Sequence, residues 1–289
     1  MARVIAVANH KGGVGKTTTV HNLGAALVKR GHRVLLIDAD AQANLTTALG
    51  ARPWELTRDK RTLAQVLAGV TPIGEAIVSG PSRRGPALLG ASGALVVVEE
   101  VLVTKDAPPT RLGRFLAAID GDYDYVLIDC APGVSRVTRN AMCAASRVLV
   151  ATTLEARSIA GIESLNATVQ DLAQRYRPDL RLLGIVPTIH DRRQSSQNTR
   201  LAELERRFGR SLTVFSPIPR TARMSGEAIS ARCAVETSHC NPGARAYLEI
   251  ARRIDTLQGS NTSVHPDFAA EVASARHEED EPEAFAATA

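Results

Sequence analysis

A glycine-rich segment near the N-terminus limits the possible folds of this chain more than any other feature. An apolar run at residues 4–8 precedes it, and a segment with helical spacing at residues 17–30 follows it. Its residues are Lys11, Gly12, Gly13, Val14, Gly15, Lys16, Thr17 and Thr18. A strand, a glycine-rich loop and a helix in this order predict a phosphate-binding loop, because backbone N–H groups and the positive end of the helix surround an anion.

The residue types within this loop predict how a nucleotide is held. We expect Lys16 to contact the β- and γ-phosphates and the Thr17 hydroxyl to coordinate Mg²⁺. The general pattern G-x-x-x-x-G-K-[ST] asks for glycine at position 10, where this chain has His10, and a second lysine, Lys11, opens the loop instead. The alternative is a glycine-rich turn with two chance lysines, and the acidic motifs described below argue against it.

The rest of the chain predicts an α/β fold. Aromatic residues make up only 3% of the sequence, so the core must be aliphatic, as suits a buried parallel sheet. Residues 94–103 fit either a strand or a helix. Further strands are predicted at 33–38, 88–92, 123–129, 147–151, 181–186 and 214–218, and helices at 62–70, 111–119, 161–175, 199–208 and 243–257. This alternation predicts a doubly wound, mostly parallel sheet with helices on both faces.

Two regions differ in composition. We expect residues 1–258 to form a single domain and residues 259–289 to be a polar, acidic and disordered tail. The four cysteines show no disulfide or metal-binding spacing, and neither a signal peptide nor an apolar run of membrane-spanning length is present. These features predict a cytoplasmic protein.

Carboxylates follow two of the predicted strands. Asp129 ends one strand, where an acidic residue can reach Mg²⁺ directly or through a water. Asp38 and Asp40 follow another, and we expect Asp40 to orient the attacking water and Asp38 to support the Mg²⁺ shell. The alternatives are a capping carboxylate at Asp129 and a solvated acidic turn at Asp40.

Together these motifs resemble those of ParA/Soj partition ATPases, the deviant-Walker-A proteins related to MinD. The resemblance covers residues 3–257 and includes the Pro-Arg and Arg-x-Ser-Gly-Glu-Ala stretch at residues 218–228. It implies ATP and Mg²⁺ as cofactors, and a nucleotide-base pocket near Pro219 and Arg220. The family usually has proline and glycine where this chain has Ala41 and Ala43.

The resemblance also implies a dimer. In this family the opening lysine, here Lys11, reaches across an ATP-sandwich homodimer to the phosphates of the partner subunit, much as an arginine finger does. Gly12 would lie where the two phosphate-binding loops meet, so a side chain there should obstruct dimerisation. A non-enzymatic nucleotide-binding module remains the alternative if Lys11 and Asp40 do not act in this way.

Charge predicts a polyanionic partner. The whole chain carries +5 and residues 260–289 carry −6, so residues 1–259 carry +11. Residues 175–223 hold eleven arginines and only four acidic residues. By resemblance, Arg192, Arg193 and Arg223 would contact double-stranded DNA without sequence preference, although a solvated charged face is the alternative.

The expected function is therefore a nucleoid-associated ATPase that partitions a chromosome or plasmid and is stimulated by a ParB-like protein. A protein cargo in place of DNA is an open alternative. A MinD-like membrane cycle is the other, but it needs a basic amphipathic C-terminal helix, and the predicted tail is acidic.

Overall fold

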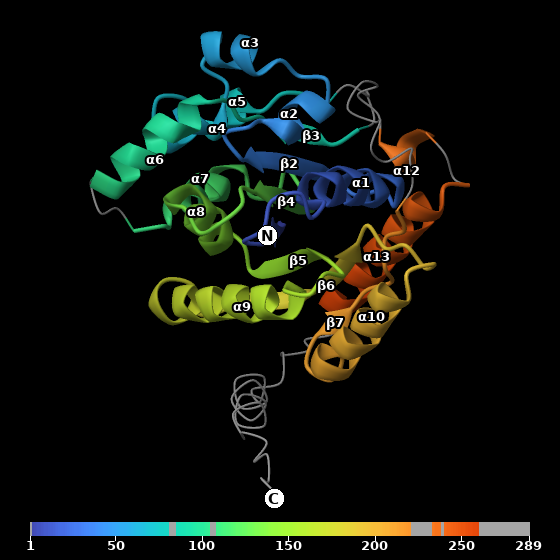
Figure 1. The fold of residues 1–289 in the computed structure, drawn as a ribbon. Helices are drawn as coiled ribbons and strands as arrows, with labels where there is room; N and C mark the ends of the chain where they lie inside the picture. The colour runs from blue at the N-terminus through green and yellow to red at the C-terminus, as the bar shows by residue number, and fades with distance from the viewer. Residues whose placement is uncertain (1, 81–84, 105–107, 221–232, 238–239, 260–289) are drawn as a thin grey trace, which may run out of the picture.

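The computed structural model describes residues 2–80, 85–104, 108–220, 233–237 and 240–259, which form a sheet with helices on both sides (Figure 1). The α/β fold predicted from the sequence is confirmed. The strands are β1 (Arg3–Ala8), β2 (Val34–Ala39), β3 (Ala87–Leu89), β4 (Tyr125–Cys130), β5 (Arg147–Thr153), β6 (Arg181–Thr188) and β7 (Thr213–Val214).

The strand order places the ends of β2 and β4, which carry Asp38 and Asp129, next to each other. The order is β3-β2-β4-β1-β5-β6-β7, and every pair of neighbouring strands in it is parallel. The chain crosses from β1 to β2, returns to place β4 between them, and then adds β5 on the other side of β1. Open α/β sheets bind ligands where the strand order reverses in this way. The loops after β1, β2 and β4 therefore meet at one edge of the sheet.

Helices account for most of the remaining described residues. They are α1 (Lys16–Lys29), α2 (Asn44–Ala48), α3 (Pro53–Arg58), α4 (Leu63–Ala68), α5 (Ile73–Ala76), α6 (Ala94–Thr104), α7 (Arg111–Leu116), the 3₁₀ turn η1 (Ala117–Ile119), α8 (Arg136–Ala144), α9 (Ser158–Arg175), α10 (Ser195–Phe208), α12 (Ala234–Thr237) and α13 (Pro242–Gly259).

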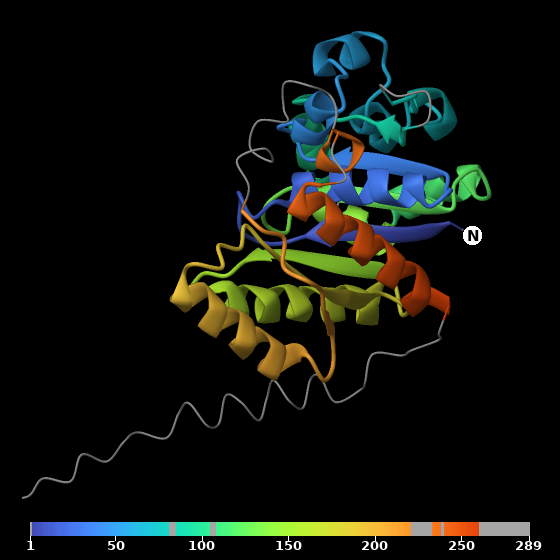
Figure 2. The same ribbon diagram turned by 90° about the vertical axis from the view of Figure 1, so that its right-hand side faces the viewer.

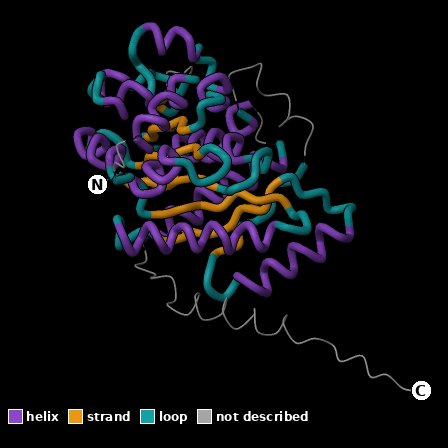
Figure 3. Tube along the Cα trace, turned by 60° about the vertical axis from the view of Figure 1, so that its left-hand side comes forward, coloured by secondary structure: helices purple, strands orange, loops and turns teal. Residues whose placement is uncertain are grey.

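The side chains of β1 alternate between two hydrophobic cores, one on each face of the sheet. Ile5 and Val7 pack in the core beneath α1 and α13, which lie across the same face in Figure 2. Ala6 and Ala8 face the opposite core, which α8 and α9 cover. Figure 3 shows these helices flanking the strands. Both faces are covered, so the central strands are almost continuously apolar, as a buried parallel sheet requires.

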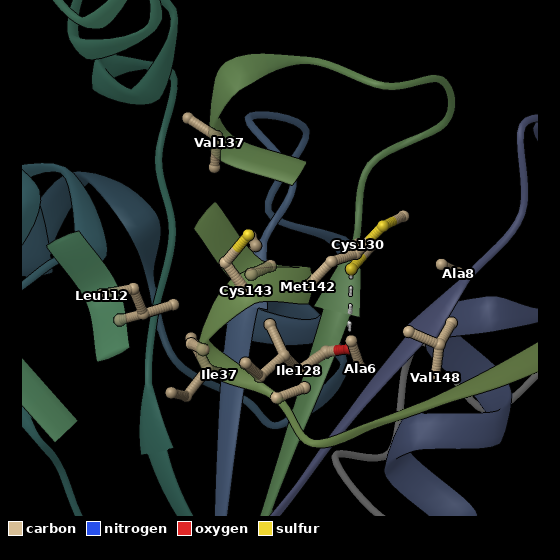
Figure 4. Packing of buried hydrophobic residues seen from close by; sticks show 14 of the residues in the cluster. Ala6, Ala8, Ile37, Leu112, Ile128, Cys130, Val137, Met142, Cys143 and Val148 are labelled. Atoms are coloured by element: carbon tan, nitrogen blue, oxygen red, sulfur yellow. Dashed lines mark hydrogen bonds between the residues drawn. The ribbon is translucent and has the colours of Figure 1, made fainter. Parts of the chain in front are cut away.

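Close packing in the second core brings β4 against α8. Ile128, Cys130, Met142 and Cys143 lie together there with Ala6 (Figure 4). Burial raises the pKa of the Cys130 thiol and raises the pKa of the Cys143 thiol to about 11. Both cysteines therefore act as small apolar residues of the core.

Some predicted elements differ from the observed ones. Residues 94–103, which fitted either a strand or a helix, form α6, in which Leu95 and Leu102 are buried while Val96 and Val97 are exposed. The strand predicted at 214–218 was too long. Only Thr213 and Val214 pair as β7, although Phe215 and Ile218 still donate backbone hydrogen bonds to the β6 carbonyl groups of Ile185 and Pro187.

None of the helices within the described ranges combines the length and the apolar composition needed to cross a bilayer. Helix α13 ends at Gly259, and the tail predicted to be disordered lies almost wholly outside the described residues, which stop there.

Candidate nucleotide-binding site

The glycine-rich loop connects β1 to α1 and is held by hydrogen bonds to β5 and β6. Asn9 donates a side-chain hydrogen bond to the Ala151 carbonyl of β5 at 2.7 Å and accepts one from the backbone N–H of Lys11 at 3.0 Å. From β6, the Thr188 hydroxyl donates to the Val14 carbonyl at 2.7 Å. These bonds, made within the protein itself, help to hold the loop in place.

Two glycines make the loop conformation possible. Gly13 and Gly15 have φ angles of 72° and 80°, in the left-handed region that side chains disfavour. Gly15 is also the residue before α1, so this turn points the start of the helix into the loop. Gly12 differs, because a Cβ atom there would lie 3.7 Å from Pro132 Cγ, an ordinary contact distance.

Lys16 begins α1 and is only 6% exposed. Its Nζ donates to the Lys11 carbonyl at 2.8 Å, so the ammonium group lies across the inside of the loop. Burial lowers the pKa of Lys16, and the negative charge of Asp129 partly opposes that shift. A phosphate in the loop would give this buried cation a charged acceptor in place of a neutral carbonyl.

Thr17 and Asp129 form the part of the site suited to a metal ion. The Thr17 hydroxyl donates to Asp129 Oδ2 at 2.7 Å, while Asp129 Oδ1 is buried and has no hydrogen-bond partner among the described residues. Burial, followed by repulsion from Asp38, raises the pKa of Asp129 well above its usual value. A hydroxyl beside an unsatisfied carboxylate oxygen is a donor set that fits Mg²⁺.

Asp38 lies beside Asp129 in the register of β2 and β4, but its oxygens already have donors. Oδ2 accepts bonds from the Thr46 backbone N–H at 2.8 Å and hydroxyl at 2.7 Å, and Oδ1 accepts one from the Asp40 N–H at 3.2 Å. Burial raises the pKa of Asp38 to about 6. Asp38 therefore positions the loop that carries Asp40, and its place in a Mg²⁺ shell stays a prediction.

A pocket of about 830 Å³ opens over these groups, within the size range of small-molecule sites. Eight of the residues predicted from the sequence line it: Gly13, Gly15, Lys16, Thr17, Thr18, Asp40, Pro219 and Arg220. Val14 is buried within the loop, and Lys11 and Gly12 are exposed and do not line the pocket. Asp40 faces the same pocket as Lys16, and its Oδ1 accepts a bond from the Gln42 N–H at 2.9 Å.

Other lining residues were not predicted. His21 and Asn22 belong to the second turn of α1, Thr188 ends β6, and Tyr247 comes from α13 near the C-terminus. The helical spacing of residues 17–30 could have indicated which side of α1 faces the loop. Nothing near Thr188 or Tyr247 in the sequence marks them, because only the strand order brings β6 and α13 to this edge.

The predicted cations Lys11, Arg192 and Arg193 do not line the pocket. Lys11 makes an ion pair with Glu155, and both side chains are more than half exposed. Arg192 and Arg193 are exposed in the loop after β6, where Arg193 pairs with Asp191 at 3.1 Å. Arg223 lies outside the described residues.

The loop of Arg192 and Arg193 is attached to the pocket wall. The backbone N–H of His190 donates to the Ile218 carbonyl at 2.9 Å, and the N–H of Arg220 donates to the His190 carbonyl at 2.9 Å. Ile218 and Arg220 both line the pocket. A shift of this wall on nucleotide binding would therefore move the arginine loop.

Comparison with known proteins gives a consistent family. An "AAA domain" family model matches residues 2–182. The chain is 38% identical over 254 residues to the chromosome partitioning protein ParA of Caulobacter vibrioides, covering 87% of this chain and 93% of that protein. It is 36% identical over 252 residues to the chromosome-partitioning ATPase Soj of Thermus thermophilus, covering 87% and 95%.

Solved structures agree on the fold. A structure of cobyrinic acid a,c-diamide synthase from Mycobacterium smegmatis, with a bound ATP analogue and magnesium, superimposes with a TM-score of 0.78 at 36% identity and covers 92% of this chain and all of that one. The chain thus belongs to the ParA/Soj-type ATPases of the MinD/ParA superfamily, which hydrolyse ATP with Mg²⁺.

Proposed function

We propose that this ATPase partitions DNA: an ATP-sandwich homodimer binds double-stranded DNA without sequence preference, and a ParB-like protein stimulates hydrolysis and release. Chromosomes and plasmids are both possible cargoes. The observation that carries the proposal is the position of Lys11, a cation of the phosphate-binding loop that is exposed and does not line the pocket of its own subunit.

Within one subunit, the described groups divide the work of phosphoryl transfer. Lys16 holds the β- and γ-phosphates, and Thr17 with Asp129 holds Mg²⁺. When bound, Mg²⁺ neutralises charge on the phosphate oxygens. Asp40, whose carboxylate faces the pocket with Lys16, orients the attacking water. Pro219 and Arg220 form the wall against the nucleotide base.

Completion of the site requires a second subunit. Lys11 is paired with Glu155 in the single subunit, so it must leave that partner to reach the phosphates across a dimer. An exposed ion pair stabilises by at most about 1 kcal/mol, which a doubly charged phosphate readily exceeds. At Gly12 the subunit itself leaves space for a Cβ atom, so the need for glycine there comes from the facing loop of the partner.

DNA binding follows from exposed arginines next to the nucleotide. Arg192 and Arg193 extend from a loop whose backbone is bonded to the pocket wall through His190 and Arg220. Dimerisation would double this basic surface, and binding to phosphates depends steeply on the number of contacts. Arg223, which follows Arg220 closely in the sequence, completes the proposed surface.

The decisive experiment measures DNA binding and oligomeric state together. With ATP, the wild-type chain should dimerise and bind DNA of any sequence, and with ADP it should do neither. Asp40→Ala should accumulate as a DNA-bound dimer because it cannot hydrolyse ATP. Gly12→Val should bind ATP but remain a monomer on gel filtration and fail to bind DNA.

The outcomes separate this function from its alternatives. An ATP-dependent dimer that binds no DNA at any salt concentration would favour a protein cargo and contradict the proposal. If the Lys11→Ala variant stays monomeric and still hydrolyses ATP at the full rate, dimerisation is not part of the mechanism.

A further inference from the structure

Three potential metal ligands meet between α1 and α12, beside the nucleotide pocket. His21 lies in the second turn of α1, Cys233 directly precedes α12, and Glu236 belongs to α12. One ligand atom from each of the three lies within 4.8 Å of the other two. His21 Nε2 is 3.8 Å from Glu236 Oε2, too far for a hydrogen bond.

The cluster is largely buried, and one of its ligand atoms is unsatisfied. His21 is 5% exposed, and its Nε2 has no hydrogen-bond partner within the described part of the chain. Cys233 is fully buried. Buried polar atoms without partners are rare in native proteins and destabilise them by about 1–3 kcal/mol each. This imidazole nitrogen lies beside a thiol and a carboxylate, and a bound cation would give it a partner.

We propose that His21, Cys233 and Glu236 bind a divalent transition metal ion of the zinc class, separate from the Mg²⁺ of the nucleotide site. Tetrahedral zinc with bonds of about 2.0–2.3 Å places its ligand atoms about 3.3–3.8 Å apart. The present spacing therefore needs to contract by about 1 Å, which side-chain rotation supplies. Three protein ligands leave a fourth position for water, and His21 also lines the nucleotide pocket.

The donor set selects the metal. Nitrogen and sulfur ligands favour zinc, cobalt and related ions, whereas Mg²⁺ takes oxygen ligands almost exclusively. Burial lowers the pKa of His21, which keeps the imidazole neutral and able to coordinate. Burial also raises the pKa of the Cys233 thiol to about 12, so the metal must displace a proton from it.

The surrounding contacts explain what such an ion would do. Helix α12 is already tied to α1, since Asn22 Oδ1 accepts a bond from the Val235 N–H at 3.2 Å and Lys29 donates to the Val235 carbonyl. The Cys233 N–H donates to Glu236 Oε2 at 2.9 Å, which orients the carboxylate. A bound metal would lock α12 onto α1 and stabilise that wall of the nucleotide pocket.

The test uses the full chain, stripped of metal, without nucleotide or Mg²⁺. All variants carry Cys240→Ser, because Cys240 is an exposed free thiol that could bind metal adventitiously. Zn²⁺ titration against a chromophoric chelator should give one tight site per chain. His21→Ala, Cys233→Ser and Glu236→Gln should each weaken it at least tenfold, while the buried, distant Cys143→Ser should not.

Two further measurements, the Co²⁺ absorption spectrum and the melting temperature, test the site even where one variant folds poorly. Co²⁺ should produce thiolate-to-metal charge-transfer absorption in the wild-type chain and lose it in Cys233→Ser. Zn²⁺ should raise the melting temperature of the wild-type chain and of Cys143→Ser, but not that of the three ligand variants. Absence of a stoichiometric site, or an unchanged affinity in Cys233→Ser, would overturn the proposal. ATP hydrolysis is not used as a readout, so failure of this site and failure of the proposed partition function remain distinguishable.

Discussion

The Thr17 hydroxyl donates to Asp129 at 2.7 Å, joining the first turn of α1 to the end of β4. This bond engages one carboxylate oxygen, and the other is buried and has no hydrogen-bond partner in the part of the chain that the structure describes. Asp38, in register on the adjacent strand, adds a second carboxylate next to it. Two buried carboxylates held side by side destabilise the fold when both are ionised, an arrangement that a bound cation would relieve.

Asp129→Asn should weaken metal binding and make the fold more stable. The amide oxygen of asparagine still accepts the Thr17 bond, but the buried charge beside Asp38 is gone. We expect the melting temperature of the nucleotide-free chain to rise by about 2–4 °C. Affinity for ADP should lose its dependence on Mg²⁺. The control is Asp124→Asn, an exposed carboxylate bonded to Arg33, which should not change Mg²⁺ dependence. A fall in melting temperature for Asp129→Asn would contradict this account.

The pH dependence of Mg²⁺ binding should follow the raised carboxyl pKa values. Burial raises the pKa of Asp38 to about 6 and that of Asp129 in the same direction. Below pH 6 the folded site holds protons that Mg²⁺ must displace, so Mg²⁺ affinity in the presence of ADP should fall as pH drops through 6. The titration of ADP itself is measured in protein-free solutions, and the Mg²⁺ affinities are corrected for it.

The stability of the metal-free chain should change with pH in the opposite direction to the Mg²⁺ affinity. Since the folded pKa of Asp38 lies above its ordinary value, its contribution to stability is fully present below pH 4 and is lost as pH rises through 6. Denaturant unfolding of the metal-free chain from pH 4 to 7, relative to Asp38→Asn, measures this. An Asp38 contribution that grows with rising pH would show that the carboxyl is not desolvated.

Much of the nucleotide site was predictable because its residues are consecutive. Residues 11–18 form a loop whose chemistry is local, and Asp40 and Asp129 follow strands with clear apolar patterns. Parallel strands place their carboxyl ends at one edge, so the convergence of these groups followed from the fold class.

What was missed depends on long-range contacts or on a neighbouring backbone. The partner of Lys11 is Glu155, which follows β5 and comes near only because β5 adjoins β1. Likewise, the two oxygens of Asp38 are engaged by Thr46 and by the backbone of Asp40, which no residue pattern reveals. Short helices such as α2 and α12 have too few residues for helical spacing to be detected.

Removal of the Lys11 partner should favour dimerisation. Glu155→Gln leaves Lys11 free to reach a second subunit. A symmetric dimer breaks two of these exposed ion pairs, each worth at most about 1 kcal/mol, so the dimer dissociation constant with ATP should decrease up to about thirtyfold. Sedimentation with ATP and Asp40→Ala in the background measures this without turnover. Lys11→Ala should abolish dimerisation whether or not Glu155 is present. An unchanged dissociation constant in Glu155→Gln would mean that the ion pair does not restrain Lys11.

Neutralising the arginine loop should change the salt dependence of DNA binding by a defined amount. Arg192→Ala with Arg193→Ala removes two phosphate contacts per subunit, so the slope of log K against log salt should become less steep by about two per subunit. ATP-dependent dimerisation should persist. Arg58→Ala, an exposed arginine in α3 at the far edge of the sheet, is the matched control. Equal losses in both variants would indicate a general charge effect with no DNA surface at this loop.

At position 43, glycine should make the fold more stable than the present alanine does. Its φ of 53° lies in the left-handed region, at the start of α2 and three residues after Asp40. An alanine there is strained by about 1–2 kcal/mol, whereas glycine adds about 0.5–1 kcal/mol of unfolded-state entropy.

Ala43→Gly should therefore raise the free energy of unfolding by up to about 1 kcal/mol. Ala41→Gly is the control. Ala41 has no positive φ, so glycine there should only lower the free energy of unfolding, through the added entropy of the unfolded chain. Denaturant unfolding of both variants without nucleotide provides the comparison. Because the Ala43 N–H donates to the Asp40 carbonyl at 2.9 Å, ATP hydrolysis by Ala43→Gly also reports whether the strained turn is needed to hold Asp40. A stabilised variant with the full hydrolysis rate would show that the strain has no catalytic role, whereas a destabilised one would show that the surrounding contacts favour the alanine.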